Sequence, residues 1–217
     1  MMQLRHFTFN PFQENTYVLY DETKEAIIID PGCYEKEEQG LLNGFIEKEG
    51  LKVKYLINTH CHIDHVLGNA FVKRKYQVPL WMHKNEVQVL KAVSAYASNY
   101  GFPGYEETEG DKFIDEKDSI TFGNTTLEIF FVPGHAPGHL IFYHPETSTC
   151  IAGDTLFQGS IGRTDLPGGD HATLLRAIKD QMFVLPDEVK VYPGHGPATT
   201  IGDEKSHNPF VGKNARF

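Results

Sequence analysis

The stretch THCHIDH, residues 59–65, places three imidazoles and one carboxylate within six positions of the chain. It follows the apolar run Tyr55–Ile57, which is short and bounded and is therefore predicted to be a buried strand. Residues 66–76, which come next, have the apolar spacing of a helix. The stretch thus lies where a strand ends and a helix begins. In α/β sheets ligands bind outside the carboxyl ends of the strands, so this position favours a binding site.

These residue types predict a divalent transition metal, because imidazole and carboxylate are the usual ligands of zinc, iron and manganese. Side chains alternate in an extended segment, so His60 and His62 are expected to face one side and share one ion. Asp64 and His65 follow the turn and are expected to bind a neighbouring ion. The alternative is a His-rich helix start with Asp64 as the N-cap. It explains one histidine, but not four ligand-type residues in six positions.

Composition limits the class of partner. The chain has 217 residues, 40% of them hydrophobic, and a net charge of −9 without any block of like charge. This balance argues against a surface that follows nucleic-acid phosphates and against a basic membrane face. We therefore expect no nucleic-acid partner and no membrane partner, and the small-molecule substrate expected below comes from a family resemblance.

The same features predict a cytoplasmic protein. The N-terminus has no apolar segment typical of a secretory signal, and no run approaches the roughly 18 apolar residues that a membrane helix needs. Cys33, Cys61 and Cys150 are too few and too scattered to indicate a disulfide framework.

The chain reads as one α/β domain with two packed sheets, spanning residues 1–217. An amphipathic helix is predicted from Tyr34 to Glu49, with Leu41, Leu42, Phe45 and Ile46 on its inner side and Gly50 at its end. The loop 99–105 is rich in glycine, proline and aromatic residues, so it is either a pocket-lining segment or an ordinary surface connection. Further predicted elements are strands 4–9, 16–20, 25–30, 79–83, 112–114, 119–122, 126–132, 140–144, 150–152 and 189–192, and helices 84–97 and 172–183.

Three later segments repeat the pattern of a strand that ends in a turn with a ligand-type residue. His135, Asp154 and His195 each follow a β-run and stand beside a glycine, which allows the backbone to approach an ion or substrate closely. Each of them alone is more often a turn residue than a ligand. Together with residues 59–65 they complete two sets of metal ligands.

The sequence resembles the metallo-β-lactamase superfamily over nearly its whole length. The matching motifs are THCHIDH at 59–65, PGHAPGH at 133–139, GD at 153–154 and GHG at 194–196, in the family's order. The resemblance implies a four-layer αβ/βα sandwich of two mixed β-sheets flanked by helices. It also implies two divalent ions, zinc first with iron or manganese as alternatives: His60, His62 and His135 on one ion, Asp64, His65 and His195 on the other, and Asp154 bridging both.

Within the superfamily the chain is similar to the short bacterial form of the glyoxalase II-like, or hydroxyacylglutathione hydrolase-like, branch. The segment 161–170, IGRTDLPGGD, and the segment 200–210 carry this likeness. The longer glyoxalase II enzymes have a C-terminal helical domain that holds glutathione, and we expect this chain to lack it.

The resemblance implies a thioester hydrolase that cleaves a small acyl-thiol such as S-lactoylglutathione by metal-activated hydroxide. Asp64 would orient the nucleophile as well as bind metal. Arg163 would either position the substrate or pair with Asp165, and pairing is the favoured interpretation. Tyr105 could donate to the substrate, although a half-buried tyrosine is the simpler expectation. Cys61, between two ligands, is expected to be a packed free thiol.

Three other functions compete with this one. GRTD at 162–165 also resembles a mononuclear-iron persulfide dioxygenase, although residues 166–170 are more similar to the hydrolase branch. A non-catalytic or nucleic-acid-processing member of the fold is disfavoured by the acidic composition. β-Lactam hydrolysis is disfavoured because no secretory signal is seen.

Overall fold

The computed structural model describes residues 1–215, which divide into two compact units. Unit 1 comprises Met1–Ile114 and Thr121–Thr126, and the other residues form unit 2. Each unit is built on a six-stranded sheet with helices packed against it, which confirms the expected fold class of two mixed sheets flanked by helices.

Unit 1 carries the sheet β1-β2-β3-β4-β5-β6. β1, β2 and β3 pair in antiparallel fashion, whereas β3, β4, β5 and β6 pair in parallel, as βαβ connections require. The strands are β1 (Gln3–Phe9), β2 (Glu14–Tyr20), β3 (Glu25–Ile29), β4 (Lys52–Ile57), β5 (Leu80–Met82) and β6 (Lys112–Phe113). The helices are α1 (Lys36–Glu49), α2 (Ile63–Val66), α3 (Asn69–Tyr76) and α4 (Val87–Tyr96), with 3₁₀ turns η1 (Lys84–Glu86) and η2 (Ala97–Tyr100).

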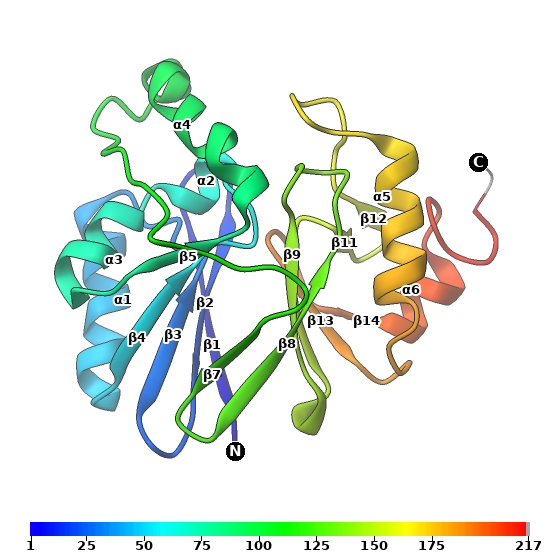
Figure 1. The fold of residues 1–217 in the computed structure, drawn as a ribbon, viewed down its shortest axis with the longest axis horizontal. Helices are drawn as coiled ribbons and strands as arrows, with labels where there is room; N and C mark the ends of the chain where they lie inside the picture. Colours follow the sequence, from blue (N-terminus) through cyan, green and yellow to red (C-terminus); the bar gives the residue numbers. More distant parts are fainter. Residues whose placement is uncertain (216–217) are drawn as a thin grey trace. The chain divides into compact units, whose positions relative to one another are not determined.

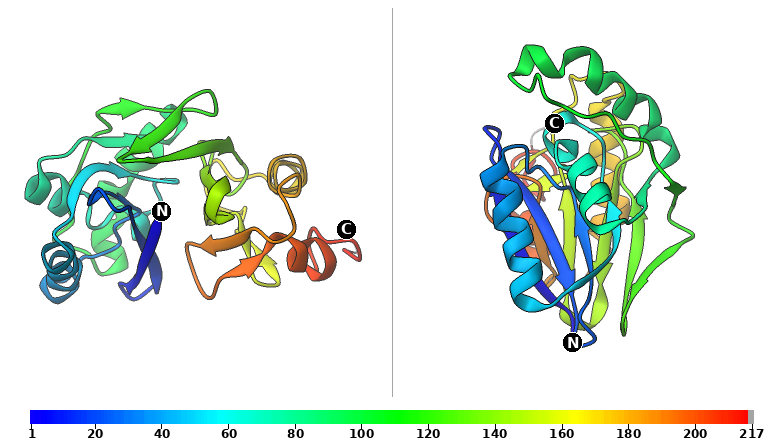
Figure 2. Two further views of the ribbon diagram at one scale, coloured as in Figure 1. Left: turned by 90° about the horizontal axis from the view of Figure 1, so that it is seen from below. Right: turned by 90° about the vertical axis from the view of Figure 1, so that its left-hand side faces the viewer.

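Helices α1 and α3 cover the same face of this sheet (Figures 1 and 2). Leu42 and Ile46 of α1 are buried in one core with strand residues such as Ile28, as the apolar stripe predicts. Leu41 was expected on the same stripe, and that expectation is wrong, because its side chain is 62% exposed. A helix turns by about 100° per residue, so Leu41 lies well to one side of the line that joins Leu42 to Ile46.

The single helix predicted after residue 65 is interrupted at Gly68. Gly68 N donates to Pro31 O at 2.7 Å, and a Cβ at this position would lie 2.6 Å from Cys33 Sγ. The backbone here packs directly on the Pro31–Cys33 segment, so the helix divides into a short α2 and a longer α3. This packing holds α2, which carries Asp64 and His65, against the loop after β3.

Unit 2 is organised on the second sheet, whose strand order is β14-β13-β10-β9-β8-β7. Residues 121–126, the tip of the hairpin at the edge of this sheet, belong to unit 1. There the buried Asp21 carboxylate accepts hydrogen bonds from Asn124 N at 2.6 Å and from Thr125 Oγ1 at 3.0 Å. The strands are β7 (Ser119–Phe122), β8 (Thr125–Phe131), β9 (Leu140–His144), β10 (Thr149–Gly153), β13 (Lys190–Pro193) and β14 (Thr199–Thr200), with a separate hairpin of β11 (Leu156–Phe157) and β12 (Ser160–Ile161).

Helices α5 (His171–Ala177) and α6 (Ile201–His207) pack on this second sheet (Figure 1). Leu174 and Ile201 are buried with strand residues such as Ala152 and Val191. The predicted helix 172–183 is α5 continued by a π-helical turn η4 (Ile178–Met182), and a 3₁₀ turn η3 (Pro145–Thr147) joins β9 to β10. Throughout residues 1–215, no helix is both long enough and apolar enough to cross a membrane.

Two neighbouring leucines of α1 test this packing. We expect Leu42→Ala to lower the free energy of unfolding by about 2–5 kcal/mol, because it leaves a cavity in a fully buried site. Leu41→Ala removes the same atoms from an exposed position and should change the free energy by less than about 0.5 kcal/mol. Urea unfolding followed by circular dichroism gives both values, and equal losses would contradict the observed orientation of α1.

Candidate metal centre

Asp30 holds both ends of the 59–65 stretch in unit 1. Because β3 and β4 are parallel, Asp30 after β3 and Thr59 after β4 lie at the same edge of the sheet. Asp30 Oδ1 accepts from Thr59 N at 2.7 Å, and Oδ2 accepts from Thr59 Oγ1 at 2.6 Å and from His65 Nδ1 at 3.1 Å. One buried carboxylate thus binds the first and the last residue of the stretch.

These bonds decide which nitrogen of each imidazole is available. A carboxylate only accepts, so His65 carries its proton on Nδ1 and presents Nε2 as a lone pair. The Thr59 hydroxyl gives its proton to Asp30, so its oxygen accepts from His60 Nδ1, which lies 3.0 Å away. Asp30 therefore orients His65 directly and His60 through Thr59. Such hydrogen bonds to the far nitrogen are typical of metal-binding histidines.

The four ligand-type residues of the stretch are close together. The ring centroids of His60 and His62 are 4.7 Å apart, and those of His60 and His65 are 4.2 Å apart. His65 Nε2 lies 3.6 Å from Asp64 Oδ2. All three imidazoles are buried, and the Asp64 side chain is 14% exposed. The structure thus gathers His60, His62, Asp64 and His65 in one place, as their spacing predicts.

Further polar residues, which no sequence motif indicates, support the same stretch. Buried Glu86 accepts from Cys61 N at 2.8 Å, and Asn58 Nδ2 donates to His65 O at 3.2 Å. Asn10 Nδ2 donates to Asp64 O at 3.0 Å. Glu14 Oε1 lies 3.9 Å from His65 Nδ1, and burial raises the pKa of the Glu14 carboxyl well above its ordinary value. These residues come from three different loops and strands, so only the fold reveals them.

Unit 2 contributes the three later ligand-type residues. β8 and β10 are each antiparallel to β9 and so run the same way, and β13 is parallel to β10. The ends of these three strands therefore meet at one edge of the sheet, and His135, Asp154 and His195 follow them. Asp154 Oδ2 lies 3.6 Å from His135 Nε2 and 3.5 Å from His195 Nε2.

Neighbouring groups orient these residues as well. His135 Nδ1 donates to Arg163 O at 2.7 Å, because a carbonyl oxygen can only accept, and His135 thus presents Nε2. Asp154 N donates to His139 Nε2 at 3.0 Å, so His139 holds the backbone of Asp154 in place. A Cβ on Gly162 would lie 3.0 Å from His135 Nδ1 and would collide with Asp154 O, so this close approach requires glycine.

The donor sets of both units suit transition-metal ions. The three measured separations between an imidazole Nε2 and a carboxylate Oδ2, 3.5, 3.6 and 3.6 Å, are longer than hydrogen bonds. Two ligands that each stand about 2 Å from one ion in tetrahedral geometry are separated by about 3.4 Å. His60, His65 and His135 use Nδ1 for hydrogen bonds to Thr59 Oγ1, Asp30 Oδ2 and Arg163 O, so each of these rings presents Nε2 as the metal-binding atom. Asp30 has a carboxylate oxygen within 4.8 Å of ligand atoms of His60 and His65, but this carboxylate already accepts four hydrogen bonds and is better described as the group that orients the two histidines.

The remaining predicted residues lie in different surroundings. Arg163 forms a two-point ion pair with Asp165, with Nε 2.7 Å from Oδ1 and Nη2 2.8 Å from Oδ2, as the pairing interpretation expects. The pair is exposed. The hydrogen bonds that Arg163 donates, together with the smaller effect of its positive charge, lower the pKa of the Asp165 carboxyl to about 2. The Tyr105 hydroxyl is buried and has no hydrogen-bond partner within residues 1–215, and burial raises its pKa. Cys61 is a buried free thiol, as predicted.

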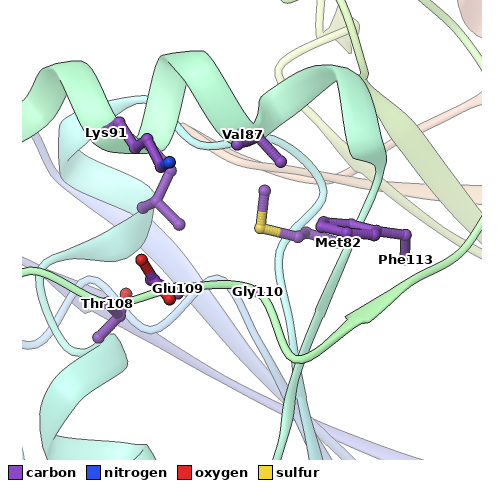
Figure 3. A pocket seen from close by; sticks show the side chains of 8 residues that line it. Met82, Val87, Lys91, Thr108, Glu109, Gly110 and Phe113 are labelled. Carbon is purple, nitrogen blue, oxygen red and sulfur yellow. The ribbon is translucent and has the colours of Figure 1, made fainter.

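A separate cavity of about 150 Å³ lies in unit 1 under α4 (Figure 3). Its lining residues are Met82, Val87, Leu90, Lys91, Thr108, Glu109, Gly110 and Phe113. None of the predicted site residues is among them, so this cavity is distinct from the ligand-type clusters.

Comparison with known proteins agrees with this geometry. The family model described as the metallo-beta-lactamase superfamily matches residues 9–195. The chain belongs to the metallo-β-lactamase superfamily. It is similar to "Hydroxyacylglutathione hydrolase GloC" of Haemophilus influenzae, with 35% identity over 212 residues, 97% of this chain and 98% of the relative.

Two solved structures share the superfamily fold over nearly the full chain. One, titled "Crystal structure of BLEG-1 B3 metallo-beta-lactamase", has a TM-score of 0.88 and 36% identity and covers 96% of this chain and 99% of its own. The other, titled "Crystal structure of TTHA1623 in a di-iron-bound form", has a TM-score of 0.84 and 33% identity and covers 95% and 100%. These relatives carry the names of different activities at nearly equal identity, so the superfamily match defines a metallo-hydrolase fold without defining its substrate.

The role of Asp30 can be tested apart from catalysis. In Asp30→Asn the amide NH₂ replaces an accepting oxygen, so Thr59 Oγ1 and His65 Nδ1 lose an acceptor. We expect zinc affinity, measured by competition with a chelating dye, to fall by about 10–100-fold. Asp21→Asn is the matched control, since both residues are 1% exposed. Among the described residues the Asp21 carboxylate accepts only from Thr23, Asn124 and Thr125. Equal zinc affinity in the two variants would contradict the assignment.

Proposed function

We propose that this protein is a metal-dependent thioester hydrolase that acts on a small acyl-thiol such as S-lactoylglutathione. The observation that carries the proposal is the pair of oriented donor sets. In each unit, imidazole Nε2 atoms lie 3.5–3.6 Å from a carboxylate oxygen, while hydrogen bonds to Nδ1 hold the rings in place. The hydroxyacylglutathione hydrolase name of the Haemophilus influenzae relative, at 35% identity, supports this substrate class.

In this proposal the two units form one superfamily domain over residues 1–217, with a single dinuclear centre. By correspondence with the superfamily motifs, one ion would be held by His60, His62 and His135, and the other by Asp64, His65 and His195. Asp154 would be a ligand of both. We propose zinc as the metal, with iron or manganese as alternatives, because this mixed imidazole and carboxylate set accepts all three. The di-iron form of one relative supports the iron alternative.

Divalent ions at this centre would supply Lewis-acid chemistry, polarising a carbonyl group and making water more acidic. The protein's own residues supply position and proton transfer. Asp64, whose carboxylate is partly exposed, orients the attacking water and accepts its proton. The water oxygen bonds to the thioester carbon, the C–S bond breaks, and the departing sulfur takes a proton to give the free thiol. One water is consumed for each acid and thiol released.

The other predicted residues have secondary roles in this proposal. The buried Tyr105 hydroxyl, which has no hydrogen-bond partner among the described residues, is proposed to donate a hydrogen bond to the substrate. Arg163 is proposed to position the substrate, and to do so it must first break its ion pair with Asp165. The three cysteines are free and buried, which supports a reducing, cytoplasmic compartment.

A substrate panel with metal analysis tests the proposal. We expect the zinc-loaded protein to hydrolyse S-lactoylglutathione or another acyl-thiol faster than a chromogenic β-lactam. Oxygen uptake with glutathione persulfide, together with one iron per chain, would instead establish the dioxygenase alternative. Faster turnover of the β-lactam than of every acyl-thiol would overturn the thioesterase assignment.

Ligand variants test the centre itself. His60→Ala and Asp154→Ala remove one proposed ligand from each unit, and we expect bound metal and turnover to fall together, turnover by more than about a hundredfold. His207→Ala, at an exposed position of α6, should retain both. Metal content measured by plasma emission spectrometry accompanies the assay. Full turnover in either ligand variant would refute the shared centre.

A further inference from the structure

Four aromatic residues of unit 1, Phe12, Tyr96, Tyr100 and Phe102, form a continuous cluster that we call the aromatic shelf. The ring centroids of Phe12 lie 6.3 Å from Tyr100 and 6.0 Å from Phe102, and those of Tyr96 and Tyr100 are 5.5 Å apart. Phe102 is buried, but Phe12 is 41% exposed and Tyr100 is 56% exposed. The cluster thus presents two large aromatic side chains at the surface.

The aromatic shelf lies beside Asp64 from two directions. Asn10 Nδ2 donates to Asp64 O at 3.0 Å, and Asn10 Oδ1 accepts from Phe12 N at 3.0 Å, so one side chain ties the turn of Phe12 to the ligand stretch. On the other side Tyr96 is the last residue of α4, a helix that contacts α2, which carries Asp64. A molecule bound at Asp64 therefore has the shelf as its neighbour.

Both loops that carry the exposed rings are fixed. Asn10 and Gln13 have φ values of 51° and 57°, and Gln13 N donates to Asn10 O at 3.0 Å, which closes the turn around Phe12. Gly101, with a φ of 92°, donates from its N to Ser98 O at 3.2 Å and closes the turn that carries Tyr100.

Phe102 anchors the centre of the shelf. It packs edge-to-face on Tyr34 with centroids 5.0 Å apart, and the Tyr34 hydroxyl accepts from Gly104 N at 2.8 Å. Rings that are already ordered lose little conformational freedom when a ligand covers them.

We propose that the aromatic shelf binds the acyl group of the substrate, so that the protein prefers small thioesters with an aromatic or other bulky apolar acyl group. This inference rests on the proposed thioester hydrolysis at Asp64 and its partners. Covering exposed aromatic area with an apolar group removes both from water and stabilises the complex.

The test compares S-benzoylglutathione with S-acetylglutathione, which share one thiol, on the zinc-loaded full chain. We expect the wild type to have the higher kcat/KM for the benzoyl thioester. Phe12→Ala and Tyr100→Ala should lower kcat/KM for the benzoyl thioester by about tenfold, mainly through KM, and that for the acetyl thioester by less than about twofold. Phe12→Leu and Tyr100→Phe should recover most of the loss. Phe113→Ala, which removes an exposed ring at the separate cavity (Figure 3), should change neither value.

The outcomes separate this inference from the proposed function. An equal loss for both thioesters, or no loss, overturns the shelf while thioester hydrolysis stands. If neither thioester is hydrolysed, the proposed function fails, and the shelf is judged by calorimetric titration of the zinc-loaded protein with benzoate. Benzoate binding at least fivefold weaker in Tyr100→Ala than in wild type supports the shelf, and unchanged binding refutes it. Zinc content equal to that of the wild type in every variant excludes an indirect effect on the ligands.

Discussion

The buried carboxylate of Asp30 is the group on which the arrangement of unit 1 depends. It accepts from the backbone and the hydroxyl of Thr59 and from His65 Nδ1, so it fixes both ends of a seven-residue stretch with one side chain. A buried carboxylate without such donors would be strongly destabilising, and here two of the bonds that stabilise it, from Thr59 Oγ1 and His65 Nδ1, also orient His60 and His65. These two hydrogen bonds therefore both stabilise the fold and set the geometry of the candidate site.

Unit 2 reaches a similar result by different contacts. Here the carboxylate of Asp154 faces two imidazoles, its backbone N–H is held by His139, and His135 is oriented by a backbone carbonyl. Glycine is needed at the closest approach, because Gly162 leaves no room for a side chain beside Asp154 and His135. In both units the ligand-type residues follow strands on short connections to the sheet. Their side chains are already ordered, so they would lose little conformational freedom on binding a metal ion.

The proposed metal ligands and the proposed substrate-binding residues are subject to different physical constraints. A metal site requires particular ligand atoms at particular separations, and the residues of the superfamily motifs match that requirement. The acyl or amide group that is cleaved is recognised by loops, and loops can vary while the ligand set stays constant. Relatives of nearly equal identity accordingly carry the names of a hydroxyacylglutathione hydrolase and of a metallo-beta-lactamase. In this chain the aromatic shelf beside Asp64 is the loop feature from which a substrate preference can be derived.

The sequence by itself determined the strand-and-turn positions of the ligand-type residues, the superfamily resemblance and most elements, because periodicity and turn residues act over short distances along the chain. It failed where the deciding contact is remote or the element is short. Leu41 was placed on the wrong side of α1, the break at Gly68 depends on Pro31 and Cys33, and β11, β12, β14 and α6 were not predicted.

Only the tertiary structure identified Asp30, Glu86 and Asn10 as supports of residues 59–65, since they lie 35, 25 and 54 positions away from the residues that they contact. It likewise joined Phe12 to Tyr100 in one cluster. The strand that carries a residue can be predicted from local pattern. The hydrogen-bond partners of that residue depend on the order of the strands in the sheet, and this order depends on contacts between distant parts of the chain.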